Sequence, residues 1–193
     1  MRRSCKRTTK AERQDLQTKP RIACVDGVAA SMPDTIDIDG VRRSTWNSIG
    51  KRIAPTEEQV RTFWNWFGAS QVVDDLGRPN VVYHGTNHDF TVFKKGEKDG
   101  LSGKGIYFSK YPLPQCGNRQ ISAYLKIERP IKRNTEKTGM REINSAGIPT
   151  KMIPDVFDKF PEFDGIMNRM EIVVKDPMQI AIYAIDVYSC EER

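Results

Sequence analysis

The segment Gly103–Ser109, "GKGIYFS", decides how the fold is interpreted, because two glycines lead directly into an apolar run. Glycines around a lysine occur in phosphate-binding loops, in plain turns and beside nucleotide pockets. A dinucleotide-binding fingerprint would need a third glycine and a following helix, neither of which this segment has. The β-branched and aromatic residues that follow favour a strand whose backbone approaches another group closely as it begins.

The strongest helix signal lies upstream of this strand, in "APTEEQVRTFWNWFG" at positions 54–68. Thr56 and Gln59 have capping-box spacing, and Gly68 supplies a stop. Apolar residues then recur at i, i+3, i+4 and i+7, which is one face of a helix. We therefore expect a helix that packs on a core through a stripe of Val60, Phe63, Trp64 and Phe67.

Short runs of β-branched and aromatic residues fill most of the remaining chain and do not alternate with helices. Two valine-rich runs flank residues 77–80 and predict a hairpin, and a second tight hairpin is expected around Asn168 and Arg169. Residues 153–160 predict one short helix. The pattern favours an α+β fold with antiparallel sheets, its strands expected within 105–109, 121–131, 163–167, 170–174 and 179–188.

Composition excludes several classes of protein. With 38% hydrophobic and 29% charged residues the chain is typical of a globular domain, and no apolar run approaches the length of a membrane span. The basic N-terminus lacks the apolar segment of a signal peptide, so we expect a cytoplasmic protein without membrane contact. Four scattered cysteines and two histidines indicate neither a disulfide framework nor a metal site.

The positive charge is confined to one end of the chain. Residues 1–21 contain eight Lys or Arg and two acidic residues, which accounts for the whole net charge of +6. We therefore divide the chain into a basic flexible tail and linker, residues 1–35, and a domain, residues 36–193. A tail of this kind is more often a solvated flexible arm than a binding element. Any weak contact with nucleic acid would come from the tail or from a local patch, because the domain itself has no basic excess.

Three polar residues occur at or within the expected strands: His84 in "VVYHGT", Tyr107 in "GIYFS", and Glu171 at the head of "EIVV". Taken singly, each is most often structural, as a hydrogen-bonding histidine, a core tyrosine or a solvated glutamate. Their order and context matter more than any one of them.

Together these motifs resemble a known enzyme class. "YHGT", "GKGIYFS" and "EIVVKDPMQI" resemble the His-Tyr-Glu class of ADP-ribosyltransferases, which includes diphtheria toxin and the poly(ADP-ribose) polymerases. Residues 36–185 further resemble the ADP-ribosyltransferase domains of phage and mobile-element polyvalent proteins. The resemblance implies a split β-sandwich of two small antiparallel sheets with a docked N-terminal helix. It also implies a mono-ADP-ribosyltransferase that uses NAD as substrate and requires no metal.

The resemblance also implies a role for each motif residue. Glu171 would stabilise the positive charge that develops on the ribose as nicotinamide leaves, Tyr107 would stack on the nicotinamide ring, and His84 would hold the adenosine ribose. The backbone of Gly85 would pair with the nicotinamide carboxamide. The cofactor-binding set implied in this way is His84, Gly85, Thr86, Gly105 and Tyr107.

Other carboxylates compete with Glu171 for the catalytic role. Asp164 precedes a glycine and Asp176 precedes a proline, positions typical of turns and caps, and Glu162 is a third competitor. Glu171 heads a β-branched run, where alternation would place it with Val173 on one face lining a cleft.

The sequence departs from the polymerase pattern at the second wall of the nicotinamide pocket. Gln115 and Asn118 stand where those enzymes have a serine and a second stacking tyrosine, and Tyr111 or Tyr124 would have to supply that face. Arg169, two residues before Glu171, differs from the Glu or Gln of arginine-modifying relatives, so arginine is not the expected acceptor.

The acceptor stays open, with protein and nucleic acid as alternatives. NAD glycohydrolysis, in which water is the acceptor, and a catalytically weak NAD-binding or interaction module are the competing interpretations. A phage-encoded enzyme of this kind would act in the cytoplasm of the bacterial host, as a toxin or effector.

Overall fold

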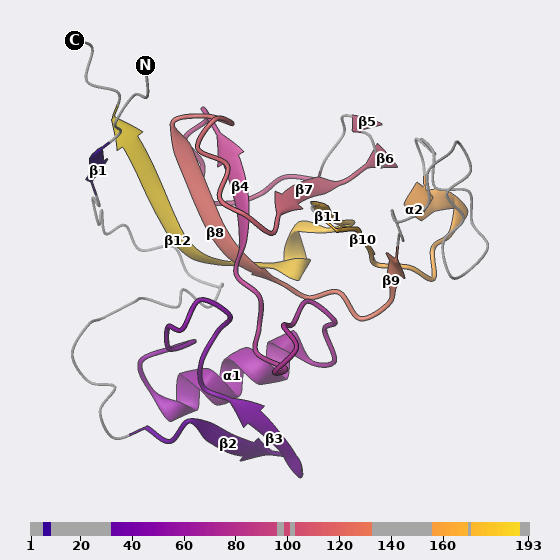
Figure 1. Cartoon of the computed structure of the whole chain (residues 1–193). Helices are drawn as coiled ribbons and strands as arrows, with labels where there is room; N and C mark the ends of the chain where they lie inside the picture. The colour runs from indigo at the N-terminus through magenta and orange to yellow at the C-terminus, as the bar shows by residue number, and fades with distance from the viewer. Residues whose placement is uncertain are drawn as a thin grey trace.

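The computed structural model describes residues 6–8, 32–95, 99–100, 103–132, 156–169 and 171–189. Figure 1 shows a sheet-rich body with one longer helix beneath it. In chain order the elements are β1 (Lys6–Thr8), β2 (Thr35–Ile38), β3 (Val41–Ser44), α1 (Glu57–Phe67), β4 (Val82–Thr86), β5 (Asp99–Gly100), β6 (Gly103–Lys104), β7 (Ile106–Ser109), β8 (Arg119–Leu125), β9 (Pro130–Lys132), α2 (Val156–Lys159), β10 (Gly165–Met167), β11 (Glu171–Val174), the 3₁₀ helix η2 (Pro177–Gln179) and β12 (Ile180–Ser189).

Eight strands form one sheet in the order β1-β12-β8-β4-β7-β11-β10-β9. A single registered pair, Tyr83 with Ser109, joins β4 to β7, so the sheet consists of two four-stranded halves where the sequence predicts two separate sheets. In Figure 1, β4, β8 and β12 stand upright, with β8 antiparallel to the other two, whereas β7 lies across the page. The fold is mostly β with few helices, as the sequence predicts. One pairing differs, because β9 and β10 are parallel.

Helix α1 forms where the periodicity predicts it. The Thr56 side chain accepts a hydrogen bond from the backbone N–H of Gln59 at 3.3 Å. Gly68, at φ 58°, ends the helix and donates its N–H to the Trp64 carbonyl at 2.8 Å. The predicted apolar stripe is buried, and burying each such side chain contributes about 1.5–3 kcal/mol.

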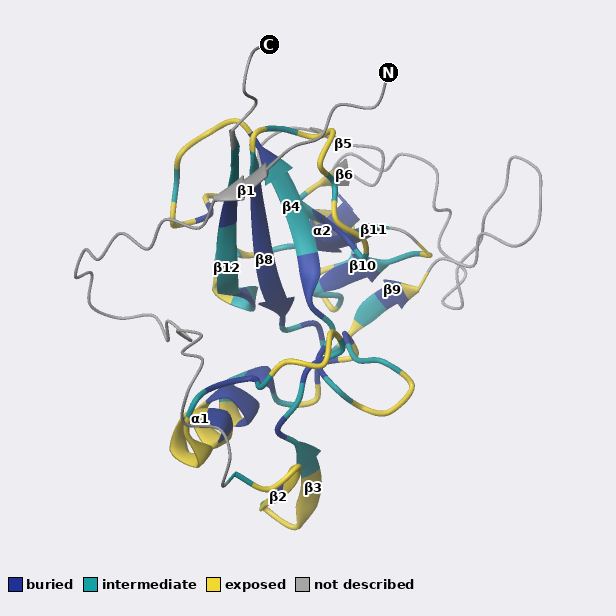
Figure 2. Cartoon of the chain, turned by 60° about the vertical axis from the view of Figure 1, so that its left-hand side comes forward, coloured by how far each residue is buried: buried dark blue, intermediate teal, exposed yellow. Residues whose placement is uncertain are grey.

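Both halves of the sheet contribute one face to a shared core. Val82 and Ile121 of the first half lie in the same cluster as Phe108 and Ile172 of the second. The opposite face of the first half packs with α1, and the opposite face of the second half packs with α2. Figure 2 shows β8 buried along its length between the partly exposed β4 and β12. The site residues therefore lie on strands that are backed on both faces.

Two local features were not predicted. Residues 6–8 pair with β12 as strand β1. The valine-rich run before Gly77 forms only an isolated bridge, Val73 with Pro79, because the strand after the turn pairs with β8 and β7 instead. The predicted hairpin of β10 and β11 and the short helix within 153–160 are both present.

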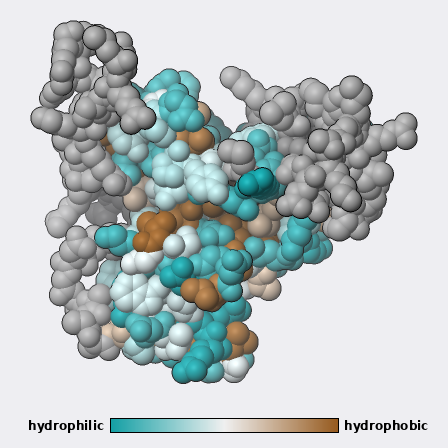
Figure 3. All heavy atoms as spheres, in the orientation of Figure 1, coloured by the Kyte–Doolittle hydropathy of each residue, from teal (hydrophilic) through white to brown (hydrophobic). Residues whose placement is uncertain are grey.

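The described surface carries no extended apolar face. On the side seen in Figure 3, hydrophilic residues predominate and hydrophobic residues form small separate patches. The exposed large hydrophobic side chains are Val41, Ile49, Leu76, Val92, Tyr111 and Met178, which come from six different segments. None of the described helices has the length and apolar character that crossing a membrane requires.

Candidate active site

The three motif residues lie on three neighbouring strands, His84 on β4, Tyr107 on β7 and Glu171 on β11. Segments far apart in the chain meet here because β7 lies between β4 and β11. Ser109 of β7 is directly opposite Tyr83 on one side and Glu171 on the other. The sequence-predicted site is thus assembled at the junction of the two half-sheets.

His84 is held by a hydrogen bond to the backbone of β7. Its Nδ1 lies 2.8 Å from the carbonyl oxygen of Tyr107. A carbonyl oxygen can only accept, so Nδ1 carries the proton in this contact. The ring is surrounded by Phe90, Phe93 and Phe108, whose centroids lie 5.2–6.2 Å from its own. The orientation of the imidazole is therefore fixed by both packing and hydrogen bonding.

This environment also sets the protonation state of His84. Burial lowers its pKa below the ordinary value of 6.5, and the hydrogen bond to Tyr107 opposes that shift without cancelling it. With Nδ1 protonated and the ring neutral, Nε2 is a hydrogen-bond acceptor. Nε2 makes no hydrogen bond to any residue that the structure describes. Nε2 can therefore accept a hydrogen bond from a hydroxyl group.

The three side chains do not share one face of the sheet. Val173 is directly opposite Tyr107, and Glu171 is directly opposite Ser109, so all four side chains lie on the face backed by α2. His84 alternates with Tyr83 and lies on the other face with Phe108. His84 therefore meets β7 through the Tyr107 backbone, while Tyr107 and Glu171 share a face.

Glu171 is half-buried at the start of β11. The predicted cleft does not extend along the whole of its face, because Val173 is fully buried against Val156 and Phe157 of α2. The prediction that Val173 lines a cleft is therefore wrong. Glu162, one of its competitors, is exposed in the turn before β10.

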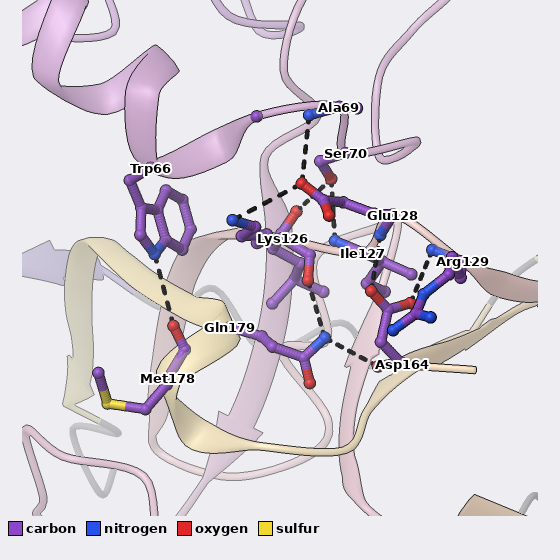
Figure 4. Close-up of polar contacts among 12 residues, drawn as sticks. Trp66, Ala69, Ser70, Lys126, Ile127, Glu128, Arg129, Asp164, Met178 and Gln179 are labelled. Carbon is purple, nitrogen blue, oxygen red and sulfur yellow. Dashed lines mark hydrogen bonds and ion pairs between the residues drawn. The ribbon is translucent and has the colours of Figure 1, made fainter. Parts of the chain in front are cut away.

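The two other competing carboxylates have structural roles. The carboxylate of Asp164 accepts the backbone N–H groups of Glu128 and Arg129, each at 2.9 Å, as Figure 4 shows. Asp176 caps η2 and accepts the N–H of Met178 at 2.8 Å. Both carboxylates are committed to backbone groups, as the sequence predicts for turn and cap residues. Glu171 remains the best candidate for the catalytic carboxylate.

Gly85 is covered by the loop that follows β7. A Cβ placed on Gly85 would lie 2.6 Å from the Cβ of Cys116 and 3.2 Å from the carbonyl oxygen of Leu113. The loop is tied down by hydrogen bonds at both ends, from Leu113 N–H to Gln120 and from Asn118 N–H to the Asn87 side chain. A ligand that reaches this face of Gly85 must therefore displace the loop.

The hydroxyl of Thr86 is used locally. It accepts the backbone N–H of His88 at 3.1 Å, and the residue is only 8% exposed. This contact uses one acceptor site of the hydroxyl and helps to shape the turn that leaves β4.

Close packing between strands accounts for the absence of a side chain at Gly105. A Cβ at this position would overlap the Cγ1 atom of Val173 and lie 3.0 Å from the carbonyl oxygen of Val174. The close approach that the glycines of "GKGIYFS" indicate is thus, at Gly105, an approach to β11. The strands that carry Tyr107 and Glu171 are held together there.

One predicted alternative for the second nicotinamide wall is excluded. Tyr124 is fully buried, its hydroxyl accepts a hydrogen bond from Asn47, and its ring centroid lies 4.9 Å from that of Phe63. Tyr111 is 60% exposed and follows β7 by two residues. Of the two tyrosines, only Tyr111 has the exposure that a ligand contact needs.

A row of polar residues was missed by sequence reasoning. Ser122, Tyr83, Ser109 and Glu171 are opposite one another in turn across β8, β4, β7 and β11. Ser109 and Ser122 are only 8% and 5% exposed. The alternation of polar and apolar residues marks each position, but only the register shows that they form one row. No group of residues suited to holding a metal is found within the described part of the chain.

One comparison with known proteins identifies a family for this chain. The model of the family described as ADP-ribosyltransferase in polyvalent proteins matches residues 74–182, more than half of the chain, and includes His84, Tyr107 and Glu171. A search of curated proteins found no match. Enzymes of this kind transfer ADP-ribosyl groups and use NAD as the donor. The chain belongs to the ADP-ribosyltransferase family of polyvalent proteins.

Proposed function

We propose that the chain is a mono-ADP-ribosyltransferase that cleaves NAD at the bond between nicotinamide and ribose and transfers ADP-ribose to a protein or nucleic acid. The observation that carries the proposal is the meeting of His84, Tyr107 and Glu171 on neighbouring strands inside the matched region. The two half-sheets are interpreted as the two sheets of the split β-sandwich expected for this class, with α1 docked against the first.

In the proposed reaction the C1′–N bond of the nicotinamide riboside breaks, and nicotinamide leaves with the bonding electron pair. A nucleophilic oxygen or nitrogen of the acceptor bonds to C1′ and loses its proton, which Glu171 accepts and passes to solvent. The Glu171 carboxylate also stabilises the positive charge on the ribose, a contribution of about 3–4 kcal/mol to the transition state.

The other residues bind and orient the dinucleotide. Nε2 of the neutral His84 ring accepts a hydrogen bond from a ribose hydroxyl, because Nδ1 is already bonded to the Tyr107 carbonyl oxygen. Tyr107 stacks on nicotinamide, and Tyr111 supplies the second aromatic face. The backbone of Gly85 binds the carboxamide once the loop that holds Cys116 has moved from the face it now covers.

The experiment uses NAD labelled in its adenylate half, incubated with the full chain and a bacterial lysate. Release of nicotinamide with the label in protease- or nuclease-sensitive material supports transfer. Nicotinamide release with only free ADP-ribose would instead show NAD glycohydrolysis. No release at all, with NAD still bound, would leave a binding module and overturn the proposal.

Matched variants assign the catalytic carboxylate. Glu171→Gln removes the charge and keeps the size, so kcat for nicotinamide release should fall about 10²–10³-fold with NAD affinity little changed. Asp176→Asn serves as the control, because Asp176 caps η2 away from the junction. An active Glu171→Gln variant beside an inactive but folded Asp176→Asn variant would reverse the assignment.

A further inference from the structure

The position of Glu171 depends on the turn that precedes it. The registered pairs of β10 and β11 end at Met167 with Ile172, so Glu171 lies just beyond the last pair on that side. On its other side Glu171 is opposite Ser109 of β7. The contact between positions 168 and 171 therefore extends the pairing of β10 and β11 to the first residue of β11.

That contact is made partly by a side chain. The backbone N–H of Asn168 donates to the carbonyl oxygen of Glu171 at 3.0 Å. The backbone N–H of Glu171 donates to Oδ1 of Asn168 at 2.5 Å. In a regular antiparallel pair both bonds would join backbone groups. Here the amide oxygen of Asn168 accepts in place of its own carbonyl, in the way that Asn side chains commonly replace backbone in turns.

We propose that Asn168 is a positioning residue that orients Glu171 for nicotinamide release, an inference that rests on the proposed function. The side chain fixes the peptide that leads into Glu171, and the carboxylate lies only three bonds beyond its Cα. A displacement of about 1 Å at a reacting group costs about 10²-fold in rate. Loss of the Asn168 amide therefore lowers the rate of bond cleavage and leaves NAD binding in place, because His84 and Tyr107 lie on other strands.

The chemistry of the amide explains why asparagine suits this position. An aspartate would also accept the N–H of Glu171, but it would add a negative charge to the group that binds the backbone of the proposed catalytic residue. A nearby like charge disfavours ionisation of a carboxyl group. Asparagine supplies the acceptor oxygen without the charge.

The test compares three variants of the full chain: Asn168→Ala, Asn168→Asp and Asp37→Ala. Asp37 is the matched control, because its Oδ1 accepts the N–H of Gly40, also three residues on, in the remote turn between β2 and β3. Initial rates of nicotinamide release are measured against NAD concentration and pH, and folding is followed by thermal unfolding.

We expect Asn168→Ala to lower kcat about 10–100-fold with KM for NAD within about twofold of wild type. Asp37→Ala should leave both constants unchanged. Asn168→Asp should recover most of the rate at high pH, with the acidic limb of the rate profile moved to higher pH. This recovery would separate positioning of the carboxylate from a general effect on folding.

An Asn168→Ala enzyme with wild-type kcat would overturn the inference alone, and so would a fall in kcat matched by Asp37→Ala. An Asn168→Asp profile that coincides with that of Asn168→Ala would also overturn it. A wild-type chain that releases no nicotinamide would remove the proposed function and this inference together. The same assay therefore distinguishes the two failures.

Discussion

Replacing Gly105 by alanine tests whether this glycine serves the fold or the ligand. Gly105 does not have a positive φ, so alanine introduces no backbone strain there. Its Cβ would nevertheless overlap Val173 Cγ1 and lie 3.0 Å from the Val174 carbonyl oxygen, with Phe157 Cε2 at 3.5 Å on the same side. The carbonyl belongs to β11 backbone and cannot move by a change of rotamer. β7 and β11 must therefore separate by a few tenths of an ångström.

Overpacking of this kind costs about 1–3 kcal/mol. For a chain of this length, each kcal/mol lowers the unfolding temperature by about 2–4 °C, so Gly105→Ala should unfold about 2–12 °C below wild type. Val173→Ala removes the overlapping methyl group, so the double variant should be more stable than the sum of the two single effects by about 0.5–3 kcal/mol. Thermal and urea unfolding of all four proteins measure this coupling. A Gly105→Ala protein with wild-type stability and no NAD affinity would refute the packing argument and assign the glycine to the ligand.

Three further predictions concern His84 and the N-terminal residues. Because burial lowers the pKa of His84, the unfolded chain binds more protons at this residue as pH falls below about 6.5, so stability is lost on acidification and recovered at higher pH. Urea unfolding at pH 7.5 and 5.5 should show a smaller loss for His84→Gln than for wild type; equal losses would contradict the buried neutral imidazole. His84→Ala should also weaken NAD binding in calorimetry, and unchanged affinity would remove it from the site. Deleting residues 1–31 should leave NAD cleavage unchanged, because the truncated chain keeps Met32 and Pro33, whose carbonyl oxygens bind Arg52. Loss of cleavage in a folded truncation would place the N-terminal segment in the site.

Local signals in the sequence predict the elements well. The α1 helix begins after Thr56 and ends before Gly68, where a hydroxyl acceptor and a glycine at φ 58° satisfy the terminal backbone groups. The hairpin of β10 and β11 follows from two short apolar runs around Asn168. In each case the determining residues lie within a few positions of one another, so periodicity and capping chemistry are enough.

Contacts between distant strands were not predictable in the same way. The sequence indicated a close backbone approach at Gly105 but not that β11 is the partner. Side chains alternate along any strand, so Tyr83 and His84 face opposite ways, yet only the structure shows that His84 reaches the Tyr107 carbonyl. The loop over Gly85 has no periodicity, so its path depends on hydrogen bonds from residues that carry no local signal. The roles assigned to the motif residues stay predictions until NAD cleavage is measured.

Because β7 lies between β4 and β11, the three motif residues can meet only after all three strands have been synthesised. The chain is synthesised from its N-terminus, and domains depend on contacts that close long loops before they become stable. Glu171 follows His84 and Tyr107 in the chain, and β12, which pairs with β8, comes later still. A nascent chain on the ribosome therefore has the strands of His84 and Tyr107 before it has the strand of the proposed catalytic carboxylate. A chain cut short before β11 keeps β4 and β7 and lacks Glu171.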